Sequence, residues 1–385
     1  MRALVWLPAL AMAVLLSFQP GLSVEQEKIE RTGALESPVQ RDLFAVAWRP
    51  VPGDEYALIA GDGGTVLEYT GKFFINLSPN VTAALLGIGW RPDGLRALIV
   101  GEQGTVLEFD GNAFRTLSAN TTSRLEDAEW RPQGDLAMVV GHDGTLLEFS
   151  GGAFTRLNST VSKPITSVSW RPDGRFAFLC GDFPYVLRFD PESGQVLRLQ
   201  TGSDQYLRMV AWRPDGGTAL VVGTLGSIFL FDGTAFVPLD SPTANQWLAA
   251  GWSPDNRTAL VAARGGLLFK YEGGIGLWTI DTNTTRSLFS IAYRLNGSYA
   301  LGVGEGGLVM RYPPAEKPPT PPPADDGAGA GWLLPSALVL LAASVAMIGL
   351  AVLLVIRARR HELERRKLEE ALERAGELAA RKKGT

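Results

Sequence analysis

Carboxylates recur at one position of a repeated turn in this chain. The turns begin at Asp62, Glu102, His142-Asp143, Asp182, Thr224, Arg264 and Glu305. If the repeats surround a common axis, five acidic side chains meet at one channel mouth, where a ring of carboxylates could hold a cation: Asp62, Glu102, Asp143, Asp182 and Glu305. Gly-Asp-Gly-Gly and Gly-Glu-Gln-Gly are also sequences typical of tight turns with positive φ and polar tips. We favour the turn interpretation and keep the five carboxylates as candidate ligands.

No other pattern predicts catalysis. The chain has two histidines, His142 and His361, and one cysteine, Cys180, which excludes a multi-histidine metal cage and an intramolecular disulfide. It shows no nucleophile motif, phosphate loop or metal-ligand spacing. We therefore predict no catalytic, cofactor-binding or metal-binding residue and no cofactor. The remaining repeated aspartates stand in Pro-Asp turn sequences: Asp93, Asp173, Asp215 and Asp255.

Composition and charge narrow the class of protein. The chain has 385 residues, of which 46% are hydrophobic and 20% are charged, values typical of a globular protein. The 36 Lys and Arg against 40 Asp and Glu give a formal net charge of -4. Such a balance provides no basic field to attract a phosphate backbone. We expect no nucleic-acid partner.

An aromatic residue recurs every 40 to 42 residues, at Trp48, Trp90, Trp130, Trp170, Trp212, Trp252 and Tyr293. Each copy contains four short hydrophobic runs separated by turn signals, as at 85–90, 96–101, 105–109 and 113–117 in the second copy. Four strands per 40-residue repeat are typical of a propeller blade. The sequence predicts an all-β, seven-bladed β-propeller over residues 24–312, with the repeat aromatics packed between blades.

The ends of the repeat region predict how the ring closes. A leucine or isoleucine of the outer strand recurs at Leu77, Leu117, Leu157, Leu199, Leu239 and Ile280, and Leu35 precedes this series by one period. The last copy runs into prolines after residue 312 without a fourth strand. The N-terminal strand around Leu35 must therefore complete the last blade, which removes the open sheet edges.

These repeats resemble two known families. Trp-Arg-Pro-Asp-Gly at 170–174 and 212–216, and Trp252-Ser253-Pro254-Asp255 most closely, resemble the turn of WD-repeat blades. The run at 100–106 and its relatives at 60–66 and 140–146 are similar to propellers of the photosystem II assembly-factor family. The resemblance covers about residues 29 to 312 and lacks the Gly-His pair and the terminal Trp-Asp of WD repeats. It implies the fold but no particular function, because propellers host unrelated activities.

The two ends predict membrane topology. Residues 1–23 have the pattern of a signal peptide, with an uncharged apolar run over 3–16. An uncleaved anchor is the alternative. Residues 332–356 carry no charge and are long enough for a transmembrane helix. The arginine-rich segment 357–385 predicts a cytoplasmic C-terminus and a basic helical tail, and the Pro- and Gly-rich segment 313–331 predicts a stalk.

Sequons are unusually frequent. Seven of nine asparagines are followed two residues later by Ser or Thr, where composition predicts about one by chance. These glycosylation candidates are Asn76, Asn80, Asn120, Asn158, Asn256, Asn283 and Asn296. Many sequons with a single cysteine suit an archaeal cell surface.

Three classes of function fit these features. We favour a non-catalytic interaction or scaffold module, anchored in the cell membrane by one helix, with the propeller outside the cytoplasm and a surface or envelope protein or glycan as partner. An extracytoplasmic assembly factor for a membrane complex is the second hypothesis. A polysaccharide hydrolase or lyase is the third, and carboxylates converging in one deep pocket would favour it.

Overall fold

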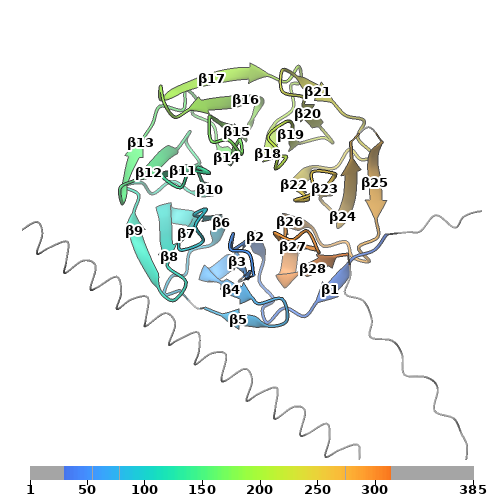
Figure 1. The fold of residues 1–385 in the computed structure, drawn as a ribbon, viewed down its shortest axis with the longest axis horizontal. Helices are drawn as coiled ribbons and strands as arrows, with labels where there is room; N and C mark the ends of the chain where they lie inside the picture. Colours follow the sequence, from blue (N-terminus) through green and yellow to red (C-terminus); the bar gives the residue numbers. More distant parts are fainter. Residues whose placement is uncertain (1–29, 54, 78, 274, 314–385) are drawn as a thin grey trace, which may run out of the picture. The chain divides into compact units, whose positions relative to one another are not determined.

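The computed structural model describes residues 30–53, 55–77, 79–273 and 275–313, which form seven antiparallel four-stranded sheets. The sheets stand side by side in a ring around a central axis, as the arrows in Figure 1 show. The expected seven-bladed β-propeller is confirmed. The predicted signal peptide, transmembrane helix and basic tail, and the stalk after residue 313, lie outside the described residues. Within the described ranges, no helix is long and apolar enough to cross a membrane.

Each blade contributes four strands, ordered from the central axis outwards, and in blades 1 to 6 this is also the chain order. Blade 1 contains β2 (Leu43–Trp48), β3 (Ala57–Gly61), β4 (Val66–Tyr69) and β5 (Phe74–Asn76). Blade 2 contains β6 (Leu85–Trp90), β7 (Ala97–Gly101), β8 (Thr105–Phe109) and β9 (Phe114–Ser118). Blade 3 contains β10 (Leu125–Trp130), β11 (Leu136–Gly141), β12 (Leu146–Ser150) and β13 (Ala153–Arg156). Blade 4 contains β14 (Ile165–Trp170), β15 (Ala177–Gly181), β16 (Phe183–Asp190) and β17 (Gln195–Gln200).

The remaining blades follow the same order. Blade 5 contains β18 (Leu207–Trp212), β19 (Ala219–Gly223), β20 (Ile228–Phe231) and β21 (Phe236–Pro238). Blade 6 contains β22 (Trp247–Trp252), β23 (Thr258–Ala263), β24 (Leu267–Glu272) and β25 (Gly276–Ile280). Blade 7 contains β26 (Leu288–Tyr293), β27 (Ala300–Gly304), β28 (Val309–Tyr312) and β1 (Gly33–Leu35). Short 3-10 turns join the second and third strands of three blades: η1 (Asp62–Gly64), η2 (Glu102–Gly104) and η3 (Glu305–Gly307).

The ring closes through its N-terminal strand, as the repeat count predicted. Strand β1 pairs with β28 in antiparallel register, with Leu35 opposite Val309. The segment before β1 continues the closure to blade 6, because the Glu30 carboxylate lies 2.5 Å from the Lys270 ammonium and also accepts a hydrogen bond from the Tyr312 hydroxyl. The first and the last described segments of the ring therefore hold blade 7 together.

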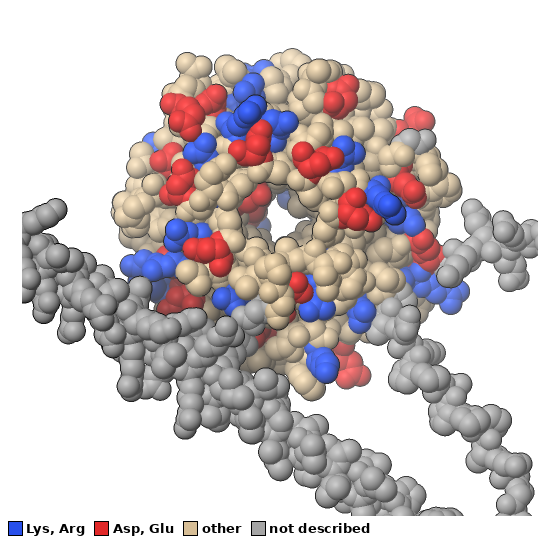
Figure 2. Space-filling view, viewed as in Figure 1, with Lys and Arg blue, Asp and Glu red and all other residues tan. Residues whose placement is uncertain are grey.

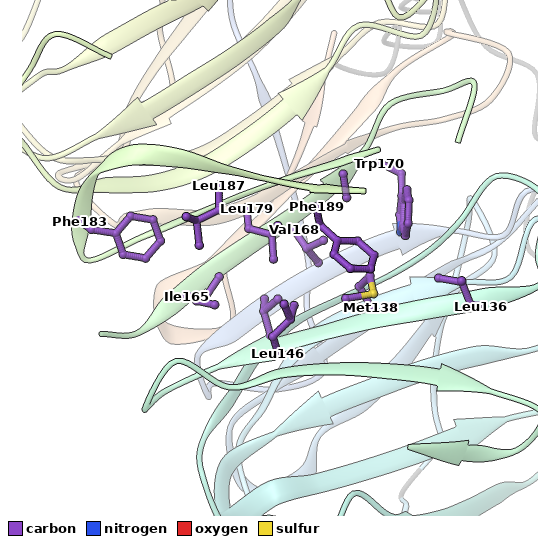
Figure 3. Close-up of a cluster of buried hydrophobic side chains, with 12 residues drawn as sticks. Leu136, Met138, Leu146, Ile165, Val168, Trp170, Leu179, Phe183, Leu187 and Phe189 are labelled. Carbon is purple, nitrogen blue, oxygen red and sulfur yellow. The ribbon is translucent and has the colours of Figure 1, made fainter. Parts of the chain in front are cut away.

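The hydrophobic core is divided among the spaces between blades. Figure 3 shows one such cluster, in which Met138 and Leu146 of blade 3 face Val168, Leu179 and Phe189 of blade 4. The second strand of a blade is covered on both sides by neighbouring blades, and all five residues of β7 are buried. A sheet covered on both faces needs a continuous hydrophobic run rather than an alternating one. This requirement accounts for sequences such as Ala-Leu-Ile-Val-Gly in the second strands.

The repeat tryptophans are structural, as expected. Trp48, Trp90, Trp130, Trp170, Trp212 and Trp252 are buried, and Tyr293 is partly buried. The indole N–H of Trp170 donates to the carbonyl of Glu129 in the preceding blade at 3.2 Å, and Trp48 contacts Ala292 in the same way. Trp90 and Trp252 make the same contact, so four of the six tryptophans link neighbouring blades by a hydrogen bond.

The arginine after the tryptophan links blades too. Nε of Arg131 donates to the carbonyl oxygen of Gly174 at 2.8 Å, and Nε of Arg171 donates to that of Gly216 at 3.1 Å. In each pair the glycine belongs to the Pro-Asp-Gly turn of the next blade. The Trp-Arg-Pro-Asp-Gly sequence therefore forms a contact that repeats from blade to blade.

The ring has two faces with different content. We call the face with the turns between second and third strands the mouth face, and the opposite one the exit face. At the exit face of blade 7, Ala300 lies opposite Tyr293 on one side and Tyr312 on the other. Gly33 of β1 pairs with Arg311, the residue before Tyr312. The C-terminal end of the described ring therefore lies at the exit face, whereas the residues before β1 hydrogen-bond to Asp281, which follows β25.

Candidate functional site: the central channel and its mouth

The five candidate carboxylates all lie in turns of the mouth face, but each has a local partner. Asp62 accepts a hydrogen bond from the backbone N–H of Gly63 at 2.8 Å, and Glu305 accepts one from Ser287 at 3.2 Å. Asp143 accepts one from the Ser123 hydroxyl at 3.1 Å. The other two form ion pairs: Glu102 with Arg124 at 3.0 Å and Asp182 with Arg208 at 3.6 Å.

These contacts keep the candidate carboxylates apart. Across residues 30–313, where described, no group of three or more His, Cys, Asp or Glu could hold a metal ion. His142 lies beside the mouth with Nε2 at 2.8 Å from the Glu126 carboxylate. The mouth face therefore carries paired charges of both signs instead of a converging acidic ring.

The channel inside the mouth is a cavity of about 490 Å³ lined by the innermost strands. Figure 2 shows its opening at the centre of the ring, with acidic and basic side chains dispersed around it. Much of the wall is apolar, with Phe44, Leu86, Ile88 and Phe289 among the lining residues. The polar groups are concentrated on blades 3 to 6.

Blade 3 gives the channel an acidic wall that we did not predict. Strand β10 places Glu126, Asp127 and Glu129 along the channel, whereas the other six innermost strands contain no carboxylate within the described residues. These three carboxylates depart from the repeat pattern, and they were not among the predicted candidates. Aligning the first strands, Leu-Glu-Asp-Ala-Glu-Trp against Leu-Leu-Gly-Ile-Gly-Trp for example, reveals the difference from sequence alone.

Two of these carboxylates join blade 3 to blade 4. The Asp127 carboxylate accepts a hydrogen bond from the backbone N–H of Val168 at 3.0 Å, and that of Glu129 accepts one from Trp170 at 2.9 Å. Other blades use neutral groups at the first of these positions, since the Ser290 hydroxyl accepts from Val46 at 3.2 Å. The innermost strand has backbone N–H groups without a sheet partner on this side, and the acidic side chains satisfy two of them.

Burial in the channel wall changes the acidity of both groups. It raises the pKa of Asp127 to about 6, against the lowering effect of hydrogen bonds from Val168 and Ala128. Burial, together with the nearby charge of Asp127, raises the pKa of Glu129 to about 8. Both carboxyls therefore exchange protons near neutral pH. Carboxyls with a raised pKa inside a cavity are common in proton-transfer sites. Here each of the two carboxyls also accepts a hydrogen bond that joins blade 3 to blade 4.

Basic groups stand at the mouth above this wall. Arg124 bridges two carboxylates, with Nη1 at 3.0 Å from Glu102 and Nε at 2.8 Å from Glu126. Nε of Arg264 donates to the neutral amide oxygen of Gln246 at 2.9 Å. The channel thus offers hydrogen-bond donors and acceptors of both charge signs around an apolar wall, an arrangement suited to binding a polar ligand.

The sequons lie on both faces of the ring. Asn80, Asn120, Asn158 and Asn283 follow outer strands on the mouth face, and Asn256 and Asn296 lie in exit-face turns. Asn256 is partly buried and its Oδ1 accepts a hydrogen bond from Asp215, while the other six are exposed. Asn120, Asn256 and Asn283 have positive φ, a conformation that asparagine tolerates well. These three asparagines therefore have a structural reason besides glycosylation, and sequon occupancy stays a prediction.

Comparison with known proteins shows the fold. No known family model and no curated protein matches the sequence of this chain. Among solved structures, the chain is similar to the crystal structure of the Cps50 (Swd1) β-propeller domain of Myceliophteria thermophila, with a TM-score of 0.62 and 13% sequence identity. The match covers 73% of this chain and 99% of that one. At this identity, the similarity shows a WD-repeat-like β-propeller fold and carries no function with it.

Proposed function

We propose that this chain is a membrane-anchored interaction module of the cell surface, with the propeller outside the cytoplasm and a binding surface at the mouth of its channel. The observation that carries the proposal is the placement of the C-terminal end of the ring, at Tyr312, on the exit face. A tether attached there leaves the whole mouth face and the channel accessible to a partner. A propeller fold in general suits protein interaction.

Sequence features support the surface location. The apolar segment at 3–16, the uncharged segment 332–356 and the basic residues after it agree on one orientation. The stalk at 313–331 would hold the ring away from the bilayer. The seven sequons and the single cysteine support an archaeal cell surface. In this setting the partner is a surface or envelope protein or glycan.

Protease added to intact cells tests the location. We expect cleavage in the stalk between Pro313 and Gly331, release of the ring, and a small membrane-bound remnant that carries the basic tail. Lysed cells serve as the control, because there the stalk is accessible in either orientation. Full protection in unbroken cells, with cleavage after lysis, would reverse the topology and refute the proposal.

One observation favours a polysaccharide hydrolase or lyase as a second candidate. Asp127 and Glu129 share one strand of the channel wall, and both have raised pKa values. Assays of the full chain against cell-wall polysaccharides separate the two functions. Hydrolysis that is lost in Glu129→Gln and retained in Asp62→Asn would favour the enzyme. Binding without turnover would favour the interaction module.

A further inference from the structure

Every innermost strand of the ring carries a β-bulge at its second residue. In blade 3, Leu125 pairs with Gly141 and Asp127 pairs with Val140, so Glu126 between them is the extra residue. The same shift between the first and third residues occurs in the other six blades. A bulge redirects a side chain. All seven extra residues line the channel cavity, one from each blade.

The seven extra side chains, which we call the bulge ring, are apolar on one side and polar on the other. Blades 6, 7, 1 and 2 are consecutive around the ring (Figure 1) and contribute the apolar arc, which consists of Leu248, Phe289, Phe44 and Leu86. Blades 3, 4 and 5 contribute the polar arc, which consists of Glu126, Thr166 and Arg208. The channel is therefore amphipathic at this level.

The bulge ring lies near the accessible end of the channel. The first residue of each innermost strand pairs with the last residue of the second strand, just before the turn on the mouth face. The bulge is one residue further in. Because the C-terminal end of the described ring lies at the exit face, a tether there leaves this entrance open to a ligand.

The apolar arc presents an aromatic surface. The rings of Phe44 and Phe289 stack with their centroids 5.7 Å apart and an interplanar angle of 29°. Both side chains are only partly buried by the fold. Leu86 and Leu248 extend the arc on either side. A ligand with an apolar face would remove this surface from water, which is favourable.

The polar arc offers hydrogen-bond acceptors and donors. The Glu126 carboxylate is held at Oε1, which lies 2.8 Å from Nε of Arg124 and 2.8 Å from Nε2 of His142, so that Oε2 can accept from a ligand. The Thr166 hydroxyl donates to the carbonyl of Arg208 at 2.7 Å and can also accept a hydrogen bond. The Arg208 guanidinium has five N–H donors.

The charges in the cavity have opposite charges beside them. Arg124 stands beside Glu126, and Asp182 lies 3.6 Å from Arg208. The described lining as a whole holds three arginines and three carboxylates: Arg124, Arg208, Arg264, Glu126, Asp127 and Glu129. A ligand with a strong net charge thus meets a like charge as well as an opposite one. This wall favours a neutral ligand that has many hydrogen-bonding groups.

We propose that the bulge ring binds one neutral sugar residue of a surface or envelope glycan. A pyranose has a face of C–H groups, and each hydroxyl at its edge can both donate and accept. The C–H face packs on Phe44 and Phe289, and the hydroxyls bond to Glu126, Thr166 and Arg208. The cavity of about 490 Å³ is in the usual size range of small-ligand sites. This inference rests on the proposed function, because it specifies the ligand at the channel mouth.

Titration of the full chain with methyl glycosides tests the sugar site. The detergent must have no sugar headgroup, and calorimetry measures the dissociation constants. The probes are the methyl glycosides of glucose, galactose, mannose and N-acetylglucosamine, with lysine and glutamate as charged probes. At least one glycoside should bind at millimolar concentration or below, and more tightly than either amino acid. Phe44→Ala and Arg208→Met should each raise its dissociation constant at least about tenfold, because each removes one contact of a small site.

The matched controls are Phe73→Ala and Arg175→Met. Phe73 is 57% exposed in the turn between β4 and β5, and Arg175 lies in the turn between β14 and β15. Neither lines the cavity, so both variants should bind like the wild type. Melting temperatures show whether each variant is folded. The Arg208 side chain is 34% exposed, so Arg208→Met should fold and test the site even if Phe44→Ala does not.

Three results would overturn the sugar site. They are the absence of binding by all four glycosides, tighter binding of lysine or glutamate, and a folded Arg208→Met variant that binds like the wild type or no more weakly than Arg175→Met. Protease treatment of intact cells reports location separately. Failure of the sugar site therefore leaves the proposed anchoring and orientation standing, and a reversed topology would refute the proposed function whatever the calorimetry shows.

Discussion

The carboxylate of Glu129 accepts a 2.9 Å hydrogen bond from the backbone N–H of Trp170 in the next blade. The equivalent residue elsewhere is alanine, glycine or serine: Ala47, Gly89, Ser169, Ala211, Gly251 and Ala292. One interface of the ring therefore depends on a titratable side chain. Because the pKa of Glu129 is raised to about 8, protonation of this group accompanies folding near neutral pH.

This relationship predicts a pH dependence of stability. The folded pKa values of Asp127 and Glu129, about 6 and about 8, lie above their ordinary values. Between about pH 4 and pH 8 the folded chain thus holds more protons than the unfolded chain, and stability falls as pH rises. The melting temperature should be several degrees higher at pH 5.5 than at pH 8.5. The corresponding difference in the free energy of unfolding should be on the order of 2 kcal/mol, because both groups are partly open to channel water.

The variant Glu129→Gln provides the control for this prediction. Its neutral amide oxygen can still accept the hydrogen bond from Trp170 but cannot titrate. The difference in melting temperature between the two pH values should shrink by half or more. An undiminished difference in a double variant with Asp127→Asn would assign the pH dependence to other groups.

Trp170→Ala should destabilise the ring strongly. Trp170 is 2% exposed, and its ring meets Phe189 edge-on at a centroid distance of 6.1 Å. Loss of a buried aromatic side chain costs about 3 to 5 kcal/mol, measurable by urea denaturation. Trp278→Ala is the matched control, because Trp278 is 43% exposed on β25, and it should cost less than about 1 kcal/mol. Similar costs for the two variants would refute the structural role of the repeat tryptophans.

Deletion of residues 24–40 should destabilise the whole ring. It removes β1, exposes the backbone edge of β28, and eliminates the Glu30–Lys270 ion pair. The melting temperature should fall by at least about 10 °C, since blade 7 loses its fourth strand. Arg31→Ala is the control, because its ion pair with Asp281 is exposed and contributes little. Equal melting temperatures for the deleted and intact chains would contradict this closure.

A comparison of Gly104→Ala with Gly151→Ala should distinguish the cost of a steric clash from the cost of backbone strain. Gly104 has φ of 68°, and a Cβ atom there would lie 1.9 Å from the carbonyl oxygen of Thr121. Gly151 has φ of 59° with nothing within 4 Å of such an atom. Gly151→Ala should cost about 1 kcal/mol from the backbone alone, and Gly104→Ala about 3 kcal/mol or more. Thermal denaturation of the two variants measures the difference. Equal costs would show that the Thr121 carbonyl moves away from the added Cβ atom at little cost in free energy.

Much of the fold follows from the sequence because it depends on local patterns. The tryptophan period marks seven repeats, and the Pro-Asp-Gly and Gly-x-x-Gly sequences mark their turns. Leu35 marks the missing fourth strand of the last blade. It belongs to an outer strand that precedes the first complete copy, and such a strand must pair with a blade that has only three strands of its own. These inferences need only the chain order and the rule that sheet edges are paired in a ring.

The contacts across blades could not be predicted in the same way. Four of the five carboxylates share one turn position, yet Glu102 pairs with Arg124 and Asp182 pairs with Arg208, both in the next blade. Their partners lie 22 and 26 residues further along the chain. The rotation between blades decides which groups meet.

The sequence by itself determined the seven repeats, the closure of the ring, and which type of residue stands at each exposed position. Only the tertiary structure decided that Asp127 and Glu129 reach backbone donors of blade 4 and acquire raised pKa values. It also decided that Leu225, in the turn between β19 and β20, has a φ of 50° and a side chain that is 69% exposed. Burial and side-chain proximity arise from how the blades pack against each other, and neither is a property of the local sequence.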